Sequence, residues 1–282
     1  MILDNLLSLP LASPYVAFGT TNVLPIIILA IVQGIAEFLP ISSSGHLVIL
    51  GAMMGELSES PTLEIILHAG TLGSILVVYW KRILDLLTSD RRVIGLLVVG
   101  TLPAVIIGLT IKQHFEWILR MPVVVGVALL ATGLFLILLG RLKPKDGEYQ
   151  RMTYLDALMI GCFQAFAILP GVSRSGSTIL GGRLLGLRND DSVTFSFLLA
   201  IPAICGATVL AVKDVIEQQG AGVAIQYTPS QMLVGAVVAF VVGIAALKWL
   251  IGWSRLDRLH WFAWWCIPMG LIVIFCAQKN LL

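Results

Sequence analysis

Residues 33–55 read QGIAEFLPISSSGHLVILGAMMG, and this stretch returns in altered form 131 positions later in the chain. The second copy, residues 164–186, reads QAFAILPGVSRSGSTILGGRLLG. The two copies align without a gap, and the identical pairs are Gln33 and Gln164, Ala36 and Ala167, Ser42 and Ser173, Ser44 and Ser175, Gly45 and Gly176, Gly51 and Gly182, and Gly55 and Gly186. The chain therefore contains an internal duplication.

The two copies differ at positions whose side chains can do chemistry. The unlike pairs are Glu37 and Ile168, Ser43 and Arg174, and His46 and Ser177. One copy thus supplies a carboxylate and an imidazole, and the other supplies a guanidinium. A site shared between the two halves of a duplicated membrane protein is the simplest interpretation of this division.

The composition is that of a membrane protein. Of the 282 residues 58% are hydrophobic and only 12% are charged, and the mean hydropathy is +0.96, whereas a soluble domain carries about 25% charge. Apolar stretches long enough to cross ~30 Å of hydrocarbon as helices lie at 62–80, 93–111, 122–140, 192–212, 230–251 and 260–277. The sequence predicts an all-α multi-pass membrane protein with about six spanning helices in one membrane domain, residues 1–282, and no nucleic-acid partner.

The positive charges predict the topology. Lys and Arg gather in four segments, at 81–92, 141–151, 183–188 and 248–258. Cytoplasmic loops collect such residues, so these segments are placed inside and both termini outside. The first 21 residues contain no Lys or Arg, so they lack the basic flank of a secretory signal and are expected to belong to the mature protein.

Two segments, 22–60 and 153–190, are too polar in the middle to be plain spans. Each must begin and end on the same side of the membrane, so we expect two re-entrant helical hairpins, the first entering from outside and the second from inside. Irregular backbone at membrane depth is tolerated only where it is buried in protein or lines a wet cavity. The two Ser-rich turns should therefore meet near the bilayer midplane, in an inverted-topology repeat of about 22–142 and 153–278.

The turns carry residues that break and restart helices. Pro40 and Pro170 are expected to end each descending helix at the residue before the proline. Gly45 and Gly176 allow close approach of the backbone, and Ser is a good cap for the ascending helices. Because a helix start attracts anions, two facing helix starts would form an anion-binding cleft.

Arg174 is the first candidate for a functional residue. It lies between Ser173 and Ser175, with Thr178 one turn further, in a stretch (157–182) that is otherwise uncharged. Charges at membrane depth are costly and are usually functional, and the planar guanidinium suits two-pronged contact with phosphate. The alternative is an ion pair with Glu37 that holds the fold, and the two roles are compatible.

His46 lies three residues after Ser43 and nine after Glu37, so nucleophile, base and carboxylate could converge. The sequence leaves open whether the imidazole takes a proton from Ser43, takes one from water or attacks phosphorus itself. A lone histidine in an apolar segment is more often a core residue, and His68 and His260 are interpreted in that way. The four cysteines are interpreted as packing residues.

Gln33 and Glu37 are four residues apart and share one helix face. Glu37 could bind a divalent cation, which prefers carboxylate oxygens and often takes other ligands from substrate phosphates, and Gln33 can add a neutral oxygen. The alternative is a polar stripe that is hydrogen-bonded inside the bundle.

The pattern Gln33-x-x-x-Glu37 followed by Pro40-x-Ser42-Ser43-Ser44-Gly45-His46, together with Pro170-Gly171-x-Ser173-Arg174-Ser175-x-x-Thr178, resembles the bacterial undecaprenyl-diphosphate phosphatases linked to bacitracin resistance. The resemblance implies hydrolysis of undecaprenyl diphosphate to undecaprenyl phosphate and inorganic phosphate, which recycles the lipid carrier for peptidoglycan synthesis. It also implies an inverted-repeat fold in the bacterial inner membrane, a site open to the outer face, and a divalent cation, Mg²⁺ or Ca²⁺.

The resemblance carries roles over by position. It implies that Glu37 and Gln33 form the acidic motif, that Ser43 and His46 are the catalytic pair, and that Arg174 binds the diphosphate with Ser173, Ser175 and Thr178. We accordingly predict a catalytic group of Ser43, His46, Glu37 and Arg174, metal ligands at Glu37 and Gln33, and further substrate binders at Ser42, Ser44 and Gln33. Gln33 departs from the family pattern, because many members have a second glutamate there.

A lipid-phosphate flippase or anion transporter built on the same inverted repeat is the main alternative. It would also use Arg174, but it would not need His46 beside Ser43. The borders at 1–22 and 56–62 lack Lys and Arg, so we expect the cavity to open outward, with a lateral gap for the tail of a polyprenyl diphosphate among the membrane lipids. A homodimer is left open.

Overall fold

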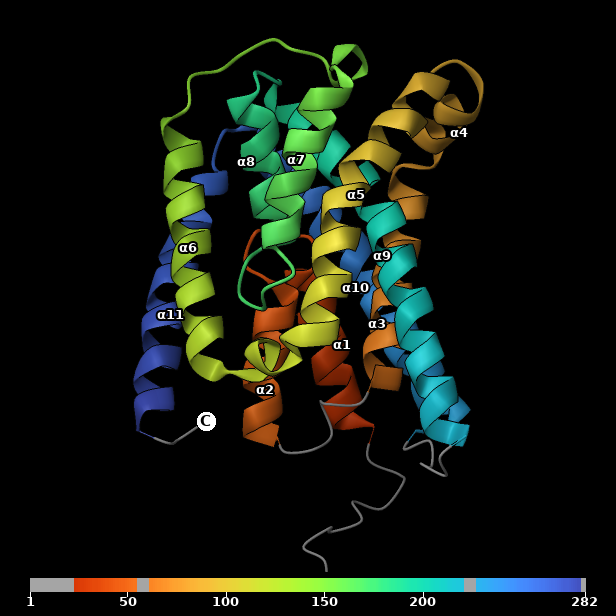
Figure 1. The fold of residues 1–282 in the computed structure, drawn as a ribbon, viewed down its shortest axis with the longest axis vertical. Coiled ribbons are helices and arrows are strands. Elements are labelled where there is room, and N and C mark those ends of the chain that lie inside the picture. Colours follow the sequence, from red (N-terminus) through yellow and green to blue (C-terminus); the bar gives the residue numbers. More distant parts are fainter. Residues whose placement is uncertain (1–22, 55–60, 221–226, 280–282) are drawn as a thin grey trace, which may run out of the picture.

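The structure is a computed structural model that describes residues 23–54, 61–220 and 227–279 (Figure 1). Within these ranges the regular secondary structure is helical, with one isolated bridge between Gly147 and Leu187 and no strand. The expectations for residues 1–22, and for most of the border at 56–62, lie outside the described residues.

Five helices in the described ranges are long and apolar enough to cross a membrane. They are α5 (Arg91–His114), α6 (Pro122–Arg141), α9 (Asn189–Gly220), α10 (Pro229–Arg255) and α11 (Ala263–Gln278), the last preceded by the short 3₁₀ helix η4 (Leu259–Phe262). A sixth candidate is bent, because α3 (Pro61–Val78) and α4 (Trp80–Thr88) meet at 71°. The prediction of an all-helical, multi-pass membrane protein with about six spans is confirmed.

The outside of the bundle is apolar, as a lipid-facing surface requires. On α5 the exposed side chains include Val98, Leu102, Val105 and Ile106. Cys162 and Cys205 are also exposed, so the interpretation of the cysteines as packing residues is wrong for these two and holds for the buried Cys266. Exposed apolar side chains are stable on this surface because acyl chains, rather than water, can contact them.

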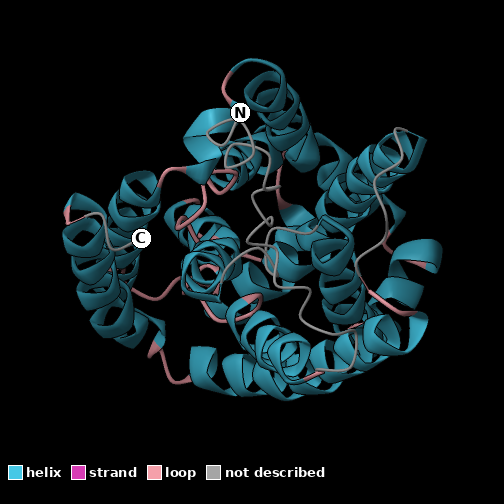
Figure 2. Cartoon of the chain, turned by 90° about the horizontal axis from the view of Figure 1, so that it is seen from below, coloured by secondary structure: helices cyan, strands magenta, loops and turns pink. Residues whose placement is uncertain are grey.

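Two shorter hairpins fill the middle of the bundle. The first consists of α1 (Leu24–Ala36) and α2 (Ser43–Met54), and the second of α7 (Tyr154–Phe166) and α8 (Arg174–Leu184). They enter from opposite ends of the molecule, and their turns meet at its centre (Figure 1). Seen from below, helices surround this centre (Figure 2). The 3₁₀ helices η2 (Glu116–Arg120) and η3 (Tyr149–Arg151) lie in connecting segments.

The long helices hold each hairpin from outside. Helix α1 packs on α10 and α7 packs on α5, while α6 packs on α11 and α3 packs on both α9 and α10. Small residues allow these close contacts: a Cβ on Gly34 of α1 would lie 2.9 Å from the Val242 side chain of α10, and Gly161 of α7 lies directly against the backbone of Gly100 on α5. Such small-residue contacts are typical of helix packing in membranes.

The descending helices end earlier than we expected from the positions of the two prolines. Helix α1 ends at Ala36 and α7 at Phe166, four residues before Pro40 and Pro170 respectively. In the second hairpin the N–H groups of residues 167, 168 and 169 bond to carbonyls three residues back, at 3.0, 3.3 and 3.2 Å. This tightening satisfies the last carbonyls of the helix before the proline is reached, so the proline lies in the turn itself.

Candidate functional site

The backbone of the two turns is interlocked. Ser42 and Gly171 both have positive φ, of 70° and 101°. A Cβ on Gly45 would lie 2.9 Å from the Cα of Gly171, and a Cβ on Gly171 would collide with the carbonyl oxygen of Val125. The Oγ of Ser42 accepts a hydrogen bond from the N–H of Gly171 at 3.1 Å. The predicted contact between the two turns is therefore confirmed.

Ser42 and Ser173 have equivalent capping roles. Each Oγ accepts from the N–H three residues later, that of Gly45 at 3.3 Å and that of Gly176 at 3.1 Å. Each also lies near the serine two positions on, Ser44 at 3.4 Å and Ser175 at 3.2 Å. The expectation that serines cap the ascending helices is confirmed. These contacts show that Ser42, Ser173 and Ser175, all almost completely buried, support the turns.

Thr132 on α6 fixes the second turn from outside the hairpin. Its hydroxyl donates to the carbonyl of Gly171 at 2.8 Å and accepts from the N–H of Ser173 at 2.9 Å. Nothing in the repeated motif points to Thr132, because its role depends on the packing of α6 against the turn.

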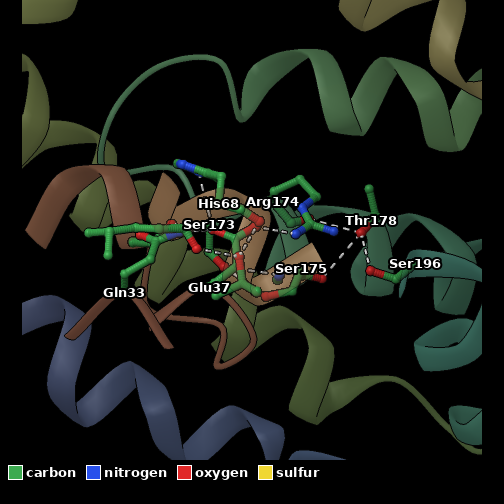
Figure 3. A network of polar contacts seen from close by, with 12 residues as sticks. Gln33, Glu37, His68, Ser173, Arg174, Ser175, Thr178 and Ser196 are labelled. Atoms are coloured by element: carbon green, nitrogen blue, oxygen red, sulfur yellow. Dashed lines mark hydrogen bonds and ion pairs between the residues drawn. The ribbon is translucent and has the colours of Figure 1, made fainter. Parts of the chain in front are cut away.

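Glu37 is the centre of the polar network (Figure 3). Its Oε2 accepts from the Ser43 hydroxyl at 2.6 Å and from the Gln33 amide at 3.1 Å, and its Oε1 accepts from Nη2 of Arg174 at 2.5 Å. Residue Glu37 as a whole is only 8% exposed. Four predicted site residues, three from the first copy and Arg174 from the second, are thus brought together around one carboxyl group.

The guanidinium of Arg174 has an unpaired hydrogen-bond donor. Its Nη2 is engaged by Glu37, but Nη1 is buried and has no hydrogen-bond partner among the described residues. An unpaired buried donor is costly, and here it belongs to a guanidinium beside a hydroxyl and a carboxylate. A phosphate oxygen would satisfy it.

Thr178 is not at the Glu37 end of this network. Its hydroxyl donates to the carbonyl of Arg174 at 2.8 Å and pairs with the hydroxyl of Ser196 on α9 at 2.6 Å. Figure 3 shows the pair on the far side of Arg174 from Glu37. In this structure Thr178 therefore supports the helix that carries Arg174.

His46 is turned away from Ser43. Its Nδ1 lies 2.7 Å from the carbonyl of Ser42, and its Nε2 lies 2.9 Å from the indole nitrogen of Trp265 on α11. Because a carbonyl only accepts and an indole N–H only donates, Nδ1 carries the proton and Nε2 accepts. Both ring nitrogens are engaged, and the structure does not bring His46 to hydrogen-bond distance of Ser43 or Glu37. In the second copy, Ser177 makes the matching bond to the carbonyl of Ser173, at 2.8 Å.

His68 belongs to the site, and its interpretation as a core residue is wrong. The Nε2 atom lies 3.7 Å from Oε2 of Glu37, and Nδ1 bonds to the carbonyl of Glu64 at 2.9 Å. The signal in the sequence is the polar spacing of Glu64, His68 and Thr71, which places the three on one face of α3. His260 is not a satisfied core residue either, because its Nδ1 is buried without a partner among the described residues.

The residues near Glu37 include few metal ligands. Within the described residues no group of three or more His, Cys, Asp or Glu side chains could hold a metal ion. One oxygen is free, however, because Oε1 of Gln33 is buried and has no partner there. One carboxylate and one amide oxygen fit a cation that takes its other ligands from substrate phosphates and water.

The sequence of this chain is similar to those of known proteins over most of its length. The family described as bacitracin resistance protein BacA matches residues 26–272. An undecaprenyl-diphosphatase of Rhodopirellula baltica is 70% identical over 249 residues, which are 88% of this chain and 96% of that protein. Proteins of the same name from Alkaliphilus metalliredigens and Halothermothrix orenii are 38% and 36% identical, covering 88% and 91% of this chain and 96% and 98% of their own lengths. A match of this extent, over both hairpins and all the long helices, shows that the chain belongs to the bacitracin resistance protein BacA family.

Proposed function

We propose that this protein hydrolyses undecaprenyl diphosphate to undecaprenyl phosphate and inorganic phosphate, which recycles the lipid carrier for peptidoglycan synthesis. Relatives that cover almost the whole chain are named undecaprenyl-diphosphatase. The observation that carries the proposal is the carboxylate of Glu37, which holds a hydroxyl on one oxygen and a guanidinium on the other. A nucleophilic hydroxyl, a base and a cationic side chain that binds phosphate are the groups that phosphoryl transfer needs.

We assign the nucleophile to Ser43 and the base to Glu37. The hydroxyl donates to the carboxylate at 2.6 Å, within the range for proton transfer. As the Ser43 oxygen bonds to the terminal phosphorus, its proton passes to Glu37, which gives it to the bridging oxygen as the bond between phosphorus and that oxygen breaks and releases the lipid monophosphate. Water then attacks the phosphorus of the serine phosphate. Glu37, again a carboxylate, takes the proton of this water and returns it to the Ser43 oxygen as inorganic phosphate is released.

Arg174 binds the phosphate through Nη1 and stabilises the negative charge that develops on its oxygens. His46 orients the first turn through the Ser42 carbonyl. Ser44, which is half-buried at the start of α2, is the serine best exposed to contact substrate. Ser42, Ser173, Ser175 and Thr178 support the donors indirectly.

We also propose that a divalent cation, Mg²⁺ or Ca²⁺, takes part. Glu37 and Gln33 would hold it, since they offer a carboxylate and a free buried amide oxygen. Such an ion supplies charge neutralisation to the diphosphate.

The finer arrangement is an inverted repeat of about 22–142 and 153–278 with two re-entrant hairpins. Support comes from equivalent contacts: α1 packs on α10 as α7 packs on α5, and α6 and α11 pair with each other. We place the protein in the bacterial inner membrane with the site open to the outer face. The four segments rich in Lys and Arg lie at one end of the bundle, which we take as the cytoplasmic end, and the first hairpin enters from the other end (Figure 1).

Phosphate release from purified prenyl diphosphate tests the function. We expect release by the wild-type protein and by Glu217→Gln, which changes an exposed carboxylate on α9 away from the site. Release should be lost with Glu37→Gln, and a chelator should inhibit the wild-type protein in a way that Mg²⁺ reverses. Movement of intact lipid diphosphate across proteoliposomes without release of phosphate would support the transporter alternative instead.

A further inference from the structure

A second polar pocket lies at the end of the molecule where α8 stops and α9 begins. It has a volume of about 320 Å³ and is lined by Pro144, Lys145, Arg183, Arg188, Asn189, Asp190 and Arg255. Three separate segments form it: the loop after α6, the connection between α8 and α9, and the last residue of α10. Four of these side chains are basic and one is acidic, so the pocket carries a net positive charge.

Arg183 is the unusual member of the lining, because this residue is only 2% exposed. It donates to three carbonyls, those of Leu187 at 3.1 Å, Lys143 at 3.2 Å and Leu142 at 3.4 Å, and its Nε has no partner among the described residues. No carboxylate in that part of the chain pairs with it. A buried charge is normally compensated by an opposite charge. The hydrogen bonds of Arg183 all go to neutral carbonyl oxygens, and the carboxylate of Asp257, which accepts a hydrogen bond from Asn189 at 3.0 Å, acts on it only from beyond ion-pair distance.

The remaining cations differ in how far they are neutralised. Arg188 is paired with the buried Asp191 at 2.7 Å. Arg255 lies 3.6 Å from Asp190, and both side chains are more than half exposed, so this contact is weak. Lys145 is exposed and makes no ion pair within the described residues. Within the described residues Arg183 and Lys145 thus form no ion pair, and the weakly paired Arg255 can add a third contact.

The pocket lies where the apolar helices end. Asn189 is the first residue of α9 and Arg255 the last of α10. Trp253, two residues before Arg255 in the chain, packs edge to face on Trp261, and tryptophan is enriched at membrane interfaces. Arg183 is nine residues beyond Arg174 on α8, a rise of about 14 Å, so the pocket is separate from the Glu37 site. Basic pockets between helices at this level suit lipid headgroups.

We propose that this pocket binds the phosphate group of an anionic phospholipid. Arg183 supplies a buried positive charge, not neutralised by an ion pair within the described residues, at its base, and Lys145 and Arg255 supply exposed donors at its rim. Zwitterionic lipids would bind less well, because their own cation offsets the phosphate. This site does not depend on the proposed hydrolysis.

Binding to the full-length protein in detergent tests the proposal. The probes are dioctanoyl phosphatidylglycerol, dioctanoyl phosphatidylcholine and inorganic phosphate, each titrated while the melting temperature is followed. The test variant is Lys145→Gln with Arg255→Gln, which spares the buried Arg183 and should fold. The matched control is Lys279→Gln. This exposed lysine directly follows α11, a helix that ends at the other end of the molecule (Figure 1).

We expect phosphatidylglycerol to stabilise the wild-type protein and the control with the same apparent affinity, and phosphatidylcholine to act much more weakly. The double variant should bind phosphatidylglycerol about thirtyfold less well, because each basic side chain near a membrane surface adds roughly a factor of five. Equal effects of the two lipids, or unchanged affinity of the double variant, would overturn the proposal. If inorganic phosphate alone produced the full effect, the lipid assignment would be wrong.

Discussion

Arg174 and Glu37 form an ion pair in which the side chains are only 16% and 7% exposed. The contribution of Arg174 to catalysis depends on the geometry of its guanidinium. Lysine at position 174 would keep the charge but lose the second prong, since an ammonium cannot hold Glu37 and a phosphate oxygen as the planar guanidinium does. We expect Arg174→Lys to lose about 2 to 4 kcal/mol of transition-state stabilisation, the range for one preorganised donor. Comparison of kcat/KM and melting temperature with the wild type checks this, and near-normal turnover of a folded variant would contradict it.

His68 acts on the same carboxylate from α3. Removing its side chain should let Glu37 shift relative to Ser43, so we expect His68→Ala to lower kcat about tenfold or more, as is typical when a positioned catalytic group loses its support. In His68→Gln an amide nitrogen can still face the carboxylate, so this variant should keep most activity with an unchanged melting temperature. If kcat were equal in the wild type and both variants, His68 would have no role in positioning Glu37.

At the scale of elements, the interlocked turns make one glycine critical. Gly171 has a φ of 101° and lies against the backbone of Val125, so Gly171→Ala introduces both strain and a collision. We expect a loss of about 1 to 3 kcal/mol in stability, measured as a lower melting temperature, and a fall in activity as Arg174 is displaced.

The control for this substitution is Gly206→Ala. Gly206 lies inside α9, and an added Cβ would meet nothing within 4 Å. Alanine favours a helix by up to about 1 kcal/mol over glycine, so this variant should melt at the wild-type temperature or higher. If the two variants were equally stable, the turns would not be as tightly packed as the structure indicates.

At the scale of the whole molecule, the sequence predicts the spans and the contact between the turns, because hydropathy and a gapless repeat are properties that the chain displays directly. It does not predict the orientation of His46. That depends on a bond to Trp265, 219 residues away, and on a main-chain carbonyl that the ring reaches once α2 has formed. The sequence does not predict the role of His68 for the same reason, since only the packing of α3 against the first turn brings this side chain to Glu37.

The orientation of the molecule can be tested with a single cysteine. Ser44 is half-buried beside the site, so a Ser44→Cys variant in a background without the four native cysteines should react with an impermeant thiol reagent added from outside intact cells. Labelling only from the cytoplasmic side would reverse the proposed orientation and leave the chemistry unaffected.

The central claim is that Ser43 and Glu37 act as one unit through their 2.6 Å hydrogen bond, and a double-mutant cycle tests it most directly. General-base catalysis contributes about 10² to 10⁴ in rate, so Ser43→Ala and Glu37→Gln should each lower kcat by that order. Groups that act together are strongly non-additive, so the double variant should be no slower than the worse single one. The account would be contradicted if the loss of kcat in the double variant equalled the product of the two single losses. It would also be contradicted if Ser43→Ala hydrolysed prenyl diphosphate at the wild-type rate.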